Sequence, residues 1–194
     1  MIKILTIVGA RPQFIKVAPV SIEFAKKNVQ EIILHTGQHF DKGMSDIFFD
    51  EMDLPIPKYN LEIGGGTHGR NTGQMLEKIE DVLFKEKPDA VLVYGDTNST
   101  LAGALAASKL HIPVLHVEAG IRSFNRKMPE EINRLITDHI AEICFAPTNN
   151  AVINLKNEGI ESKKIIMSDD VMADATRIYG EISNKNSSII NKLN

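Results

Sequence analysis

Short apolar runs, rich in β-branched residues, recur along this 194-residue chain, and segments with a helical pattern separate most of them. Runs of this kind suit strands that are buried on both faces of a parallel sheet. Strands that alternate with helices are typical of a doubly wound architecture, because each helix carries the chain back to the start of the next parallel strand. The sequence therefore predicts an α/β fold with a Rossmann-like, doubly wound parallel sheet, whose strands span 2–8, 31–35, 90–94, 113–117, 143–146 and 164–167.

Residues that start and stop helices support this alternation. Thr148 stands before the helical segment 149–158 and Gly159 follows it, which gives a capping hydroxyl and a glycine stop. A second helix is expected over residues 97–110, with Thr, Asn and Ser at its start and an alanine-rich body. Residues 71–84 predict another helix.

The order of the strands decides where a ligand can bind. If residues 59–63 form the third strand, the run 90–94 is the fourth and lies beside the first in the common order 3-2-1-4-5-6. The loops after these two strands, 9–11 and 95–97, then flank the topological switch point, where open α/β sheets bind ligands. We therefore expect functional residues at those two loops.

Composition narrows the class of protein. The formal net charge of −3, without a basic stripe interleaved with aromatic residues, argues against a nucleic-acid partner. No segment approaches the ~18 uninterrupted apolar residues of a membrane-spanning helix, and residues 1–8 predict a first strand rather than a targeting peptide. The single cysteine, Cys144, excludes an intramolecular disulfide and fits a reducing compartment. These features predict one domain with a tail, in the cytoplasm, without nucleic-acid or membrane partners.

Three carboxylates follow the predicted strands. Asp96 and Glu118 stand just past two of the apolar runs, and Glu130 begins a helical segment. Acids placed together at strand ends suit general acid–base catalysis. Each also has a structural alternative: Asp96 can cap the next helix, and Glu130 can form a surface ion pair with Arg134, worth about 0.3–0.5 kcal/mol. For Glu118, which ends a buried strand beside two small residues, the alternative is weaker.

Two glycine-containing loops are candidate phosphate sites. In residues 9–12, Gly-Ala-Arg-Pro, a strand joins a helix, and Arg11 and Lys16 place two cations near a helix N-terminus, where anions are favoured. The spacing matches neither G-x-G-x-x-G nor a Walker loop, so a turn with solvated charges is the alternative. The loop 64–69 is better interpreted as flexible and able to act as a lid.

His35, His39 and Asp41 lie close together in the sequence and raise the question of a metal site. Two histidines at a strand end, with no further cysteine or histidine cluster, make a weak case for zinc. We interpret them as hydrogen-bonding residues at the mouth of the crevice and predict no metal.

Six short motifs, in order along residues 1 to about 175, resemble the non-hydrolysing UDP-N-acetylglucosamine 2-epimerases. Each motif alone has little specificity, but six in register are highly specific. The segments 124–128 and 64–69 are more similar to the branch that acts on diacetamido-glucuronic acid nucleotides. The motifs are Gly9-Ala10-Arg11-Pro12 with Lys16, Thr36-Gly37-Gln38-His39, Gly95-Asp96-Thr97, His116-Val117-Glu118-Ala119-Gly120-Ile121-Arg122, Pro129-Glu130-Glu131-Ile132-Asn133-Arg134 and Phe145-Ala146-Pro147-Thr148.

The resemblance implies two Rossmann-like lobes in the glycosyltransferase-B arrangement, with a UDP-sugar between them. It implies epimerisation at C2 without NAD or metal: loss of the C2 proton with anti elimination of UDP gives a glycal, and UDP then returns with reprotonation on the opposite face. By motif position, Asp96, Glu118 and Glu130 resemble the catalytic carboxylates of the family. The expected substrate-binding set consists of Arg11, Lys16 and Arg134, which resemble its cations, and of His39 at the crevice mouth.

The chain departs from this family in two respects. Residues 168–170, Ser-Asp-Asp, stand where the family usually has Gly-Asp or Gly-Asn. The second lobe, which normally supplies most contacts to UDP and a further catalytic histidine, is expected to be absent. Residues 1–170 are then the N-terminal epimerase lobe, and 171–194 a helical interlobe or tail segment. Because water would reach the site and UDP would be poorly held, the lobe is expected to be inactive alone.

Two other hypotheses stay open. A glycosyltransferase-B transferase lobe shares the architecture but has no need of three acids so arranged. A non-catalytic half-protein would bind or assemble with a partner. The resemblance also leads us to expect a homodimer or a separate C-terminal lobe as partner.

Overall fold

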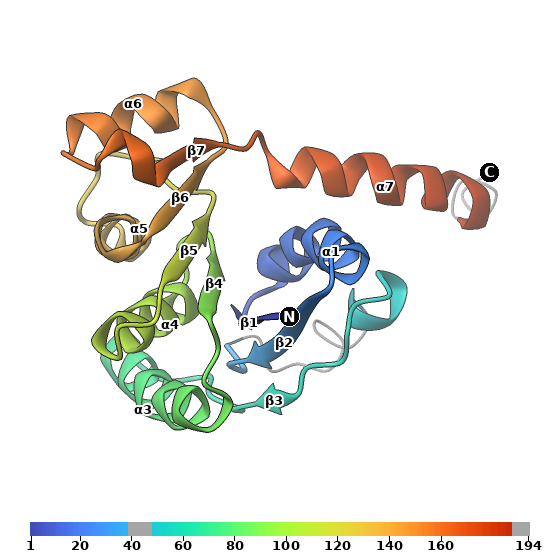
Figure 1. Cartoon of the computed structure of the whole chain (residues 1–194), viewed down its shortest axis with the longest axis horizontal. Helices are drawn as coiled ribbons and strands as arrows, with labels where there is room; N and C mark the ends of the chain where they lie inside the picture. Colours follow the sequence, from blue (N-terminus) through green and yellow to red (C-terminus); the bar gives the residue numbers. More distant parts are fainter. Residues whose placement is uncertain (39–47, 188–194) are drawn as a thin grey trace.

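The computed structural model describes residues 1–38 and 48–187. Its centre is a seven-stranded parallel sheet in the order β3-β2-β1-β4-β5-β6-β7 (Figure 1). The strands are β1 Ile2–Val8, β2 Val29–His35, β3 Tyr59–Asn60, β4 Ala90–Tyr94, β5 Val114–Val117, β6 Ile143–Ala146 and β7 Ile165–Met167. The helices are α1 Arg11–Lys26, α3 His68–Glu86, α4 Asn98–Lys109, α5 Pro129–Ile140, α6 Asn149–Asn157, the short 3-10 helix η1 Ser162–Lys164 and α7 Val171–Asn186.

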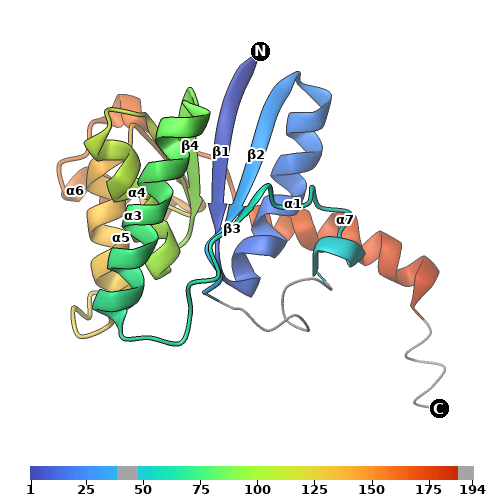
Figure 2. The same ribbon diagram turned by 90° about the horizontal axis from the view of Figure 1, so that it is seen from below.

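Helices cover both faces of the sheet. Helices α3 to α6 lie on one side, and α1 and α7 lie on the other (Figure 2). Each face buries its own apolar cluster, with Met75 and Ile79 of α3 in one and Phe14 and Val17 of α1 in the other. The small residues of α4 let it approach the sheet closely, since a Cβ at Gly103 would lie 2.7 Å from Ile7 Cδ1.

The predicted strand order is confirmed. β1 pairs in parallel with β2 on one side and β4 on the other, so the fourth strand lies beside the first. The predicted helix starts are also confirmed: the hydroxyls of Thr97 and Thr148 each accept a hydrogen bond, at 3.2 Å, from the N–H three residues on. The loops after β1 and β4 therefore flank the switch point, as expected from the strand count.

Several predicted boundaries differ from the structure by one or two residues, and two differ by three. The third strand ends at Asn60 rather than at residue 63, because Glu62 has a φ of +54° and its N–H donates to Asn60 Oδ1 at 3.1 Å, which makes a turn. Helix α3 begins at His68 rather than at residue 71, because Thr67 serves as its N-cap. The last glycine of the 64–69 loop therefore belongs to the helix.

The chain leaves β7 and crosses to the other face of the sheet as α7, which packs against α1. Asp170 begins this helix by accepting a hydrogen bond from the N–H of Met172 (2.9 Å), so the unusual Ser-Asp-Asp sequence supplies its cap. Tyr179 of α7 donates its hydroxyl hydrogen to the carbonyl oxygen of Met52 (2.8 Å). Within the described ranges, no helix combines the length and the apolar character needed to cross a membrane.

Candidate active site

One buried side chain, Gln13 in the first turn of α1, holds the loops after β1 and β4 together. Its Oε1 accepts hydrogen bonds from the N–H groups of Gly9 (2.7 Å) and Ala10 (3.0 Å). Its Nε2 donates to the carbonyl oxygen of Tyr94 (2.8 Å), at the end of β4. Gln13 is not among the predicted site residues, although a glutamine at the third helical position is a capping signal. The switch point is thus a hydrogen-bonded junction of two loops.

The first acid–cation pair joins Glu118, just past β5, to Lys16 of α1. Lys16 Nζ donates to Glu118 Oε2, and the lysine is buried while the carboxylate stays partly exposed. Glu118 has a φ of +71°, and left-handed backbone costs a non-glycine residue about 1–2 kcal/mol. Such strain persists only where the surrounding structure enforces it, and it is frequent at functional sites.

Gly95, in the loop after β4, leaves room for this pair. Its φ is +63°, and a Cβ at this position would lie 3.0 Å from Glu118 Oε2 and 3.5 Å from Lys16 Nζ. The β4 loop therefore passes directly beside the acid that follows β5. The next residue, Asp96, is brought to the same place.

The second acid–cation pair is Asp96 with Arg134 of α5. Arg134 Nε and Nη2 donate to Asp96 Oδ2 at 3.0 and 2.6 Å. Asn133 holds the same loop by donating from Nδ2 to the carbonyl oxygen of Asp96 (2.8 Å). The capping alternative for Asp96 is wrong, because Thr97 is the N-cap of α4.

Glu131, rather than Glu130, is the helical partner of Arg134. Arg134 Nη1 donates to Glu131 Oε2 (2.8 Å), and this buried carboxylate also accepts from the N–H groups of Ser123 (3.0 Å) and Phe124 (2.9 Å). Burial raises the pKa of Glu131, but these hydrogen bonds outweigh it and hold the pKa at about 2. The alternative of a Glu130–Arg134 ion pair is therefore wrong. Residues three and four positions apart are both within reach on a helix, and Arg134 pairs with Glu131, three positions before it.

Four of the seven predicted site residues form these two pairs. Glu130 is half-buried in the first turn of α5 and makes no side-chain hydrogen bond or ion pair with any residue that the structure describes. Arg11 is exposed at the first position of α1. His39 lies outside the described residues.

Of the three residues considered as metal ligands, His39 and Asp41 lie outside the described residues. His35 is buried, stacks on Phe14 and accepts a hydrogen bond at Nδ1 from the N–H of Gly37 (3.0 Å). Over residues 1–38 and 48–187, no group of three or more His, Cys, Asp or Glu side chains is arranged to hold a metal ion.

A cluster of mostly buried ionisable side chains contacts the backbone of the loops after β4 and β5 and is not among the predicted features. His116 of β5 contacts Asp138 of α5 through Nδ1 (2.6 Å) and the carbonyl oxygen of Gly95 through Nε2 (2.7 Å). Arg122 contacts the other oxygen of Asp138 (2.7 Å) and the carboxylate of Glu158 (2.6 Å). One sequence signal could have indicated this cluster. Asp138 stands four positions after Arg134, and residues at this spacing lie on the same face of a helix.

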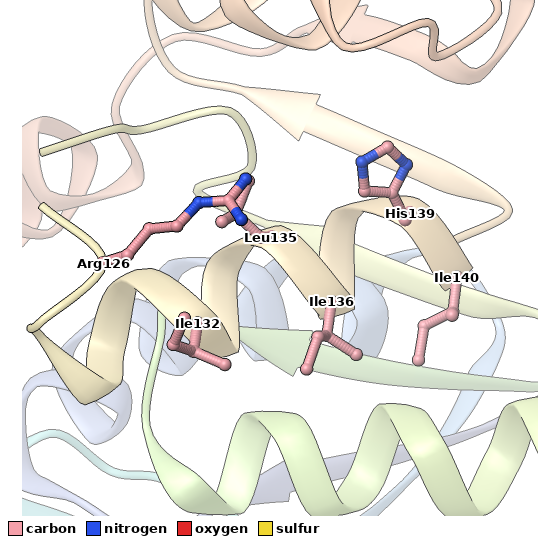
Figure 3. Close-up of a pocket in the computed structure, with 6 residues that line it drawn as sticks. All are labelled: Arg126, Ile132, Leu135, Ile136, His139 and Ile140. Carbon is pink, nitrogen blue, oxygen red and sulfur yellow. The ribbon is translucent and has the colours of Figure 1, made fainter. Parts of the chain in front are cut away.

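The outer face of α5 carries a separate, mainly apolar pocket. Figure 3 shows Ile132, Ile136 and Ile140 in a row along one side of the helix and His139 on the other, while Arg126 extends towards the helix from the segment before it. The pocket is lined by Arg126, Ile132, Leu135, Ile136, His139 and Ile140.

A doubly wound sheet with two acid–cation pairs at its switch point defines a class of protein: a Rossmann-like α/β lobe with paired charges at the place where open sheets of this kind bind ligands. The family model described as UDP-N-acetylglucosamine 2-epimerase matches residues 23–194, and the chain belongs to this family.

Two curated relatives illustrate this membership. The chain is 63% identical over 193 residues to a UDP-N-acetylglucosamine 2-epimerase homolog of Methanococcus maripaludis, covering 99% of this chain and 54% of that protein. It is 60% identical over 182 residues to the UDP-2,3-diacetamido-2,3-dideoxy-D-glucuronate 2-epimerase of Pseudomonas aeruginosa, covering 92% of this chain and 51% of that protein. The chain thus spans about half the length of these relatives.

Solved structures agree with this membership. The Methanocaldococcus jannaschii UDP-GlcNAc 2-epimerase, crystallised with UDP-GlcNAc and UDP, superposes with a TM-score of 0.96 at 54% identity, over 98% of this chain and 52% of that one. The MurG structure of Acinetobacter baumannii shares the fold alone, with a TM-score of 0.61 at 17% identity over 87% of this chain and 45% of that one.

Proposed function

We propose that this chain is the N-terminal lobe of a nucleotide-sugar 2-epimerase that acts on UDP-N-acetylglucosamine or on UDP-2,3-diacetamido-glucuronate. Residues 1–170 form the lobe, and 171–194 continue into the segment between lobes. The observation that carries the proposal is the presence of two acid–cation pairs, Glu118–Lys16 and Asp96–Arg134, at one switch point. Family membership and the names of the relatives support the reaction and leave both substrates as candidates.

The proposed reaction needs proton transfer on both faces of C2 and a place for the charge of UDP. A carboxylate removes the C2 proton, the bond from C1 to the UDP oxygen breaks with its electron pair leaving on UDP, and a C1–C2 double bond forms. UDP then adds back at C1 while a carboxylic acid delivers a proton to the other face of C2. The sugar is neither oxidised nor reduced overall, so the route needs no redox cofactor.

We assign the proton transfers to Asp96 and Glu118, which follow β4 and β5 at the carboxyl ends of these strands, and to Glu130 in the first turn of α5. Lys16 and Arg134 each lie against a carboxylate, so each can exchange that partner for a diphosphate oxygen without becoming an unpaired charge. The substrate-binding set is completed by Arg11, at a helix N-terminus that favours anions, and by His39.

Isotope exchange tests the proposal. The chain is incubated in deuterium oxide with each candidate nucleotide sugar, alone and together with the C-terminal lobe of a full-length relative, and deuterium at C2 is measured by mass spectrometry. We expect slow or no exchange with the chain alone and restored exchange with both lobes. No label at C2 with both lobes would contradict the proposal, and transfer of the sugar without C2 label would instead support a transferase.

Substitution tests the central acid. In the two-lobe assembly, Glu118→Gln should lower C2 exchange by roughly 10²- to 10⁴-fold, the usual contribution of a general acid or base. The matched control is Glu142→Gln, which removes an exposed carboxylate that pairs with Lys164 at 3.2 Å away from the site, and which should leave exchange unchanged. Undiminished exchange in a folded Glu118→Gln protein would remove this residue from the catalytic set.

We also propose a cytoplasmic location and assembly with a second lobe or a second copy. Cys144 is a free, buried thiol, which suits a reducing compartment. Burial raises its pKa to about 12, which makes the thiol unreactive. Light scattering of the chain with and without the C-terminal lobe distinguishes a homodimer from a complex of two lobes.

A further inference from the structure

The side chain of His116 is completely buried, and both groups that meet its ring nitrogens are hydrogen-bond acceptors. Nδ1 lies 2.6 Å from Asp138 Oδ1, and Nε2 lies 2.7 Å from the carbonyl oxygen of Gly95. A carbonyl oxygen has no hydrogen to donate. Asp138 Oδ2 accepts a hydrogen bond from the N–H of Gly120 (3.0 Å) and lies 2.7 Å from Arg122 Nη2, so this side chain is a carboxylate and an acceptor as well. Both ring nitrogens must then carry hydrogen, which makes His116 an imidazolium.

The surroundings balance this buried charge. Among the described residues, the charged groups that face the pair are Arg122, in the loop after β5, and Glu158, at the end of α6. Two cations and two carboxylates therefore neutralise one another, which is the condition for burying charges at acceptable cost. Cys144 of β6 also lies here, with Sγ 3.6 Å from the carbonyl oxygen of Asp138, and its raised pKa keeps it neutral.

This pair contacts the backbone of both acid-bearing loops. His116 holds the carbonyl oxygen of Gly95, directly before Asp96, and Asp138 Oδ2 accepts from the N–H of Gly120 (3.0 Å), two residues after Glu118. Gly120 has a φ of +81°, and a Cβ there would lie 2.4 Å from a carbonyl oxygen of α6. The loop after β5 therefore follows a path that needs both glycine and an anchor for its N–H.

We propose that His116 is a positioning residue: as a buried imidazolium paired with Asp138, it fixes the loop that carries Asp96 against the loop that carries Glu118. It lies too deep to touch a substrate and acts only through the backbone of those loops. Its effect on catalysis rests on the proposed epimerase function, whereas its charge and its hold on the loops do not.

Nitrogen-15 NMR of the unsubstituted chain tests the charge. The His116 signals are assigned by their loss in His116→Gln. At neutral pH, where an ordinary imidazole is mostly neutral, both His116 nitrogens should show protonated shifts. One protonated and one unprotonated nitrogen would overturn the imidazolium.

Amide hydrogen exchange tests the bracing. His116→Gln should speed exchange of the Gly120 amide and of the amides in 95–97 by at least about tenfold. Glutamine is neutral and differs in shape, so it cannot keep both of the contacts that His116 makes, with Asp138 and with the carbonyl oxygen of Gly95. The matched control is Thr137→Val, which lies on α5 next to Asp138. Thr137 is completely buried, and its hydroxyl has no hydrogen-bond partner among the described residues. Equal exchange in the two variants would overturn the bracing.

Kinetics test the consequence for catalysis. In the two-lobe assembly, His116→Gln should lower kcat for C2 exchange by about 10²-fold with KM unchanged, since a misplacement near 1 Å costs on that order. A change in KM alone, or an equal loss of kcat in Thr137→Val, would overturn the positioning role. If the unsubstituted assembly exchanges no deuterium, the epimerase proposal fails, and the NMR and amide-exchange results alone decide the role of His116.

Discussion

At the scale of single residues, the site depends on Gly95, because a larger residue there would crowd the carboxylate of Glu118. An alanine at position 95 would have to adopt a φ of +63°, and its Cβ would lie 3.0 Å from the carboxylate of Glu118. We therefore expect Gly95→Ala to lower the free energy of unfolding by about 1–2 kcal/mol, the cost of left-handed backbone. The Glu118–Lys16 pair should shift as well, and C2 exchange in the two-lobe assembly should fall. Urea denaturation and the isotope assay measure the two effects.

A second glycine provides the control for that substitution. Gly73 lies inside α3, and a Cβ there would meet no atom within 4 Å. Because alanine is favoured over glycine in helix interiors, Gly73→Ala should raise the free energy of unfolding by about 0.5–1 kcal/mol. A Gly95→Ala protein as stable as the original would show that the backbone at position 95 is free to relax.

At the scale of elements, the start of α5 organises the loop before it. Glu131 binds the N–H groups of Ser123 and Phe124, and its pKa of about 2 lies below the ordinary value of 4.5. A depressed pKa stabilises the fold fully above about pH 4.5, and this contribution is lost as the pH falls towards 2. Glu131→Gln should therefore reduce stability at neutral pH and flatten its dependence on pH in this window. Urea midpoints at neutral pH and inside the window measure both effects, and an unchanged pH slope would contradict the prediction.

The elements also show what sequence patterns can and cannot predict. Apolar runs predicted most strands, capping threonines predicted helix starts, and the rules of parallel sheets predicted the strand order and the switch point where the candidate site lies. The partner of Arg134 was harder to predict, since helical spacing permits both Glu130 and Glu131. The junction at Gln13 joins residues 81 positions apart, and the left-handed backbone of Glu118 is enforced by tertiary contacts. No local pattern encodes either feature.

At the scale of the whole molecule, α7 links the end of the described chain to its beginning. Ala175 is 2% exposed, and Tyr179 packs with the apolar cluster under α1 while its hydroxyl bonds to Met52. The proposed boundary at residue 170, between the lobe and the segment that follows it, therefore does not separate α7 from the fold of residues 1–170. One cooperative unfolding transition is expected for both parts together.

Truncation tests this coupling. A chain that ends at residue 170 should keep the circular dichroism of a folded α/β sheet but melt several degrees lower, because it loses burial worth on the order of 2–3 kcal/mol, about that of one large apolar side chain. Tyr179→Phe is the matched control: it removes only the 2.8 Å hydrogen bond to Met52 and should cost about 0.5–1.5 kcal/mol. Two separate transitions in the intact chain, or an unchanged melting temperature after truncation, would mean that α7 is not coupled to the lobe. An unfolded truncated chain would mean that the lobe boundary lies beyond residue 170.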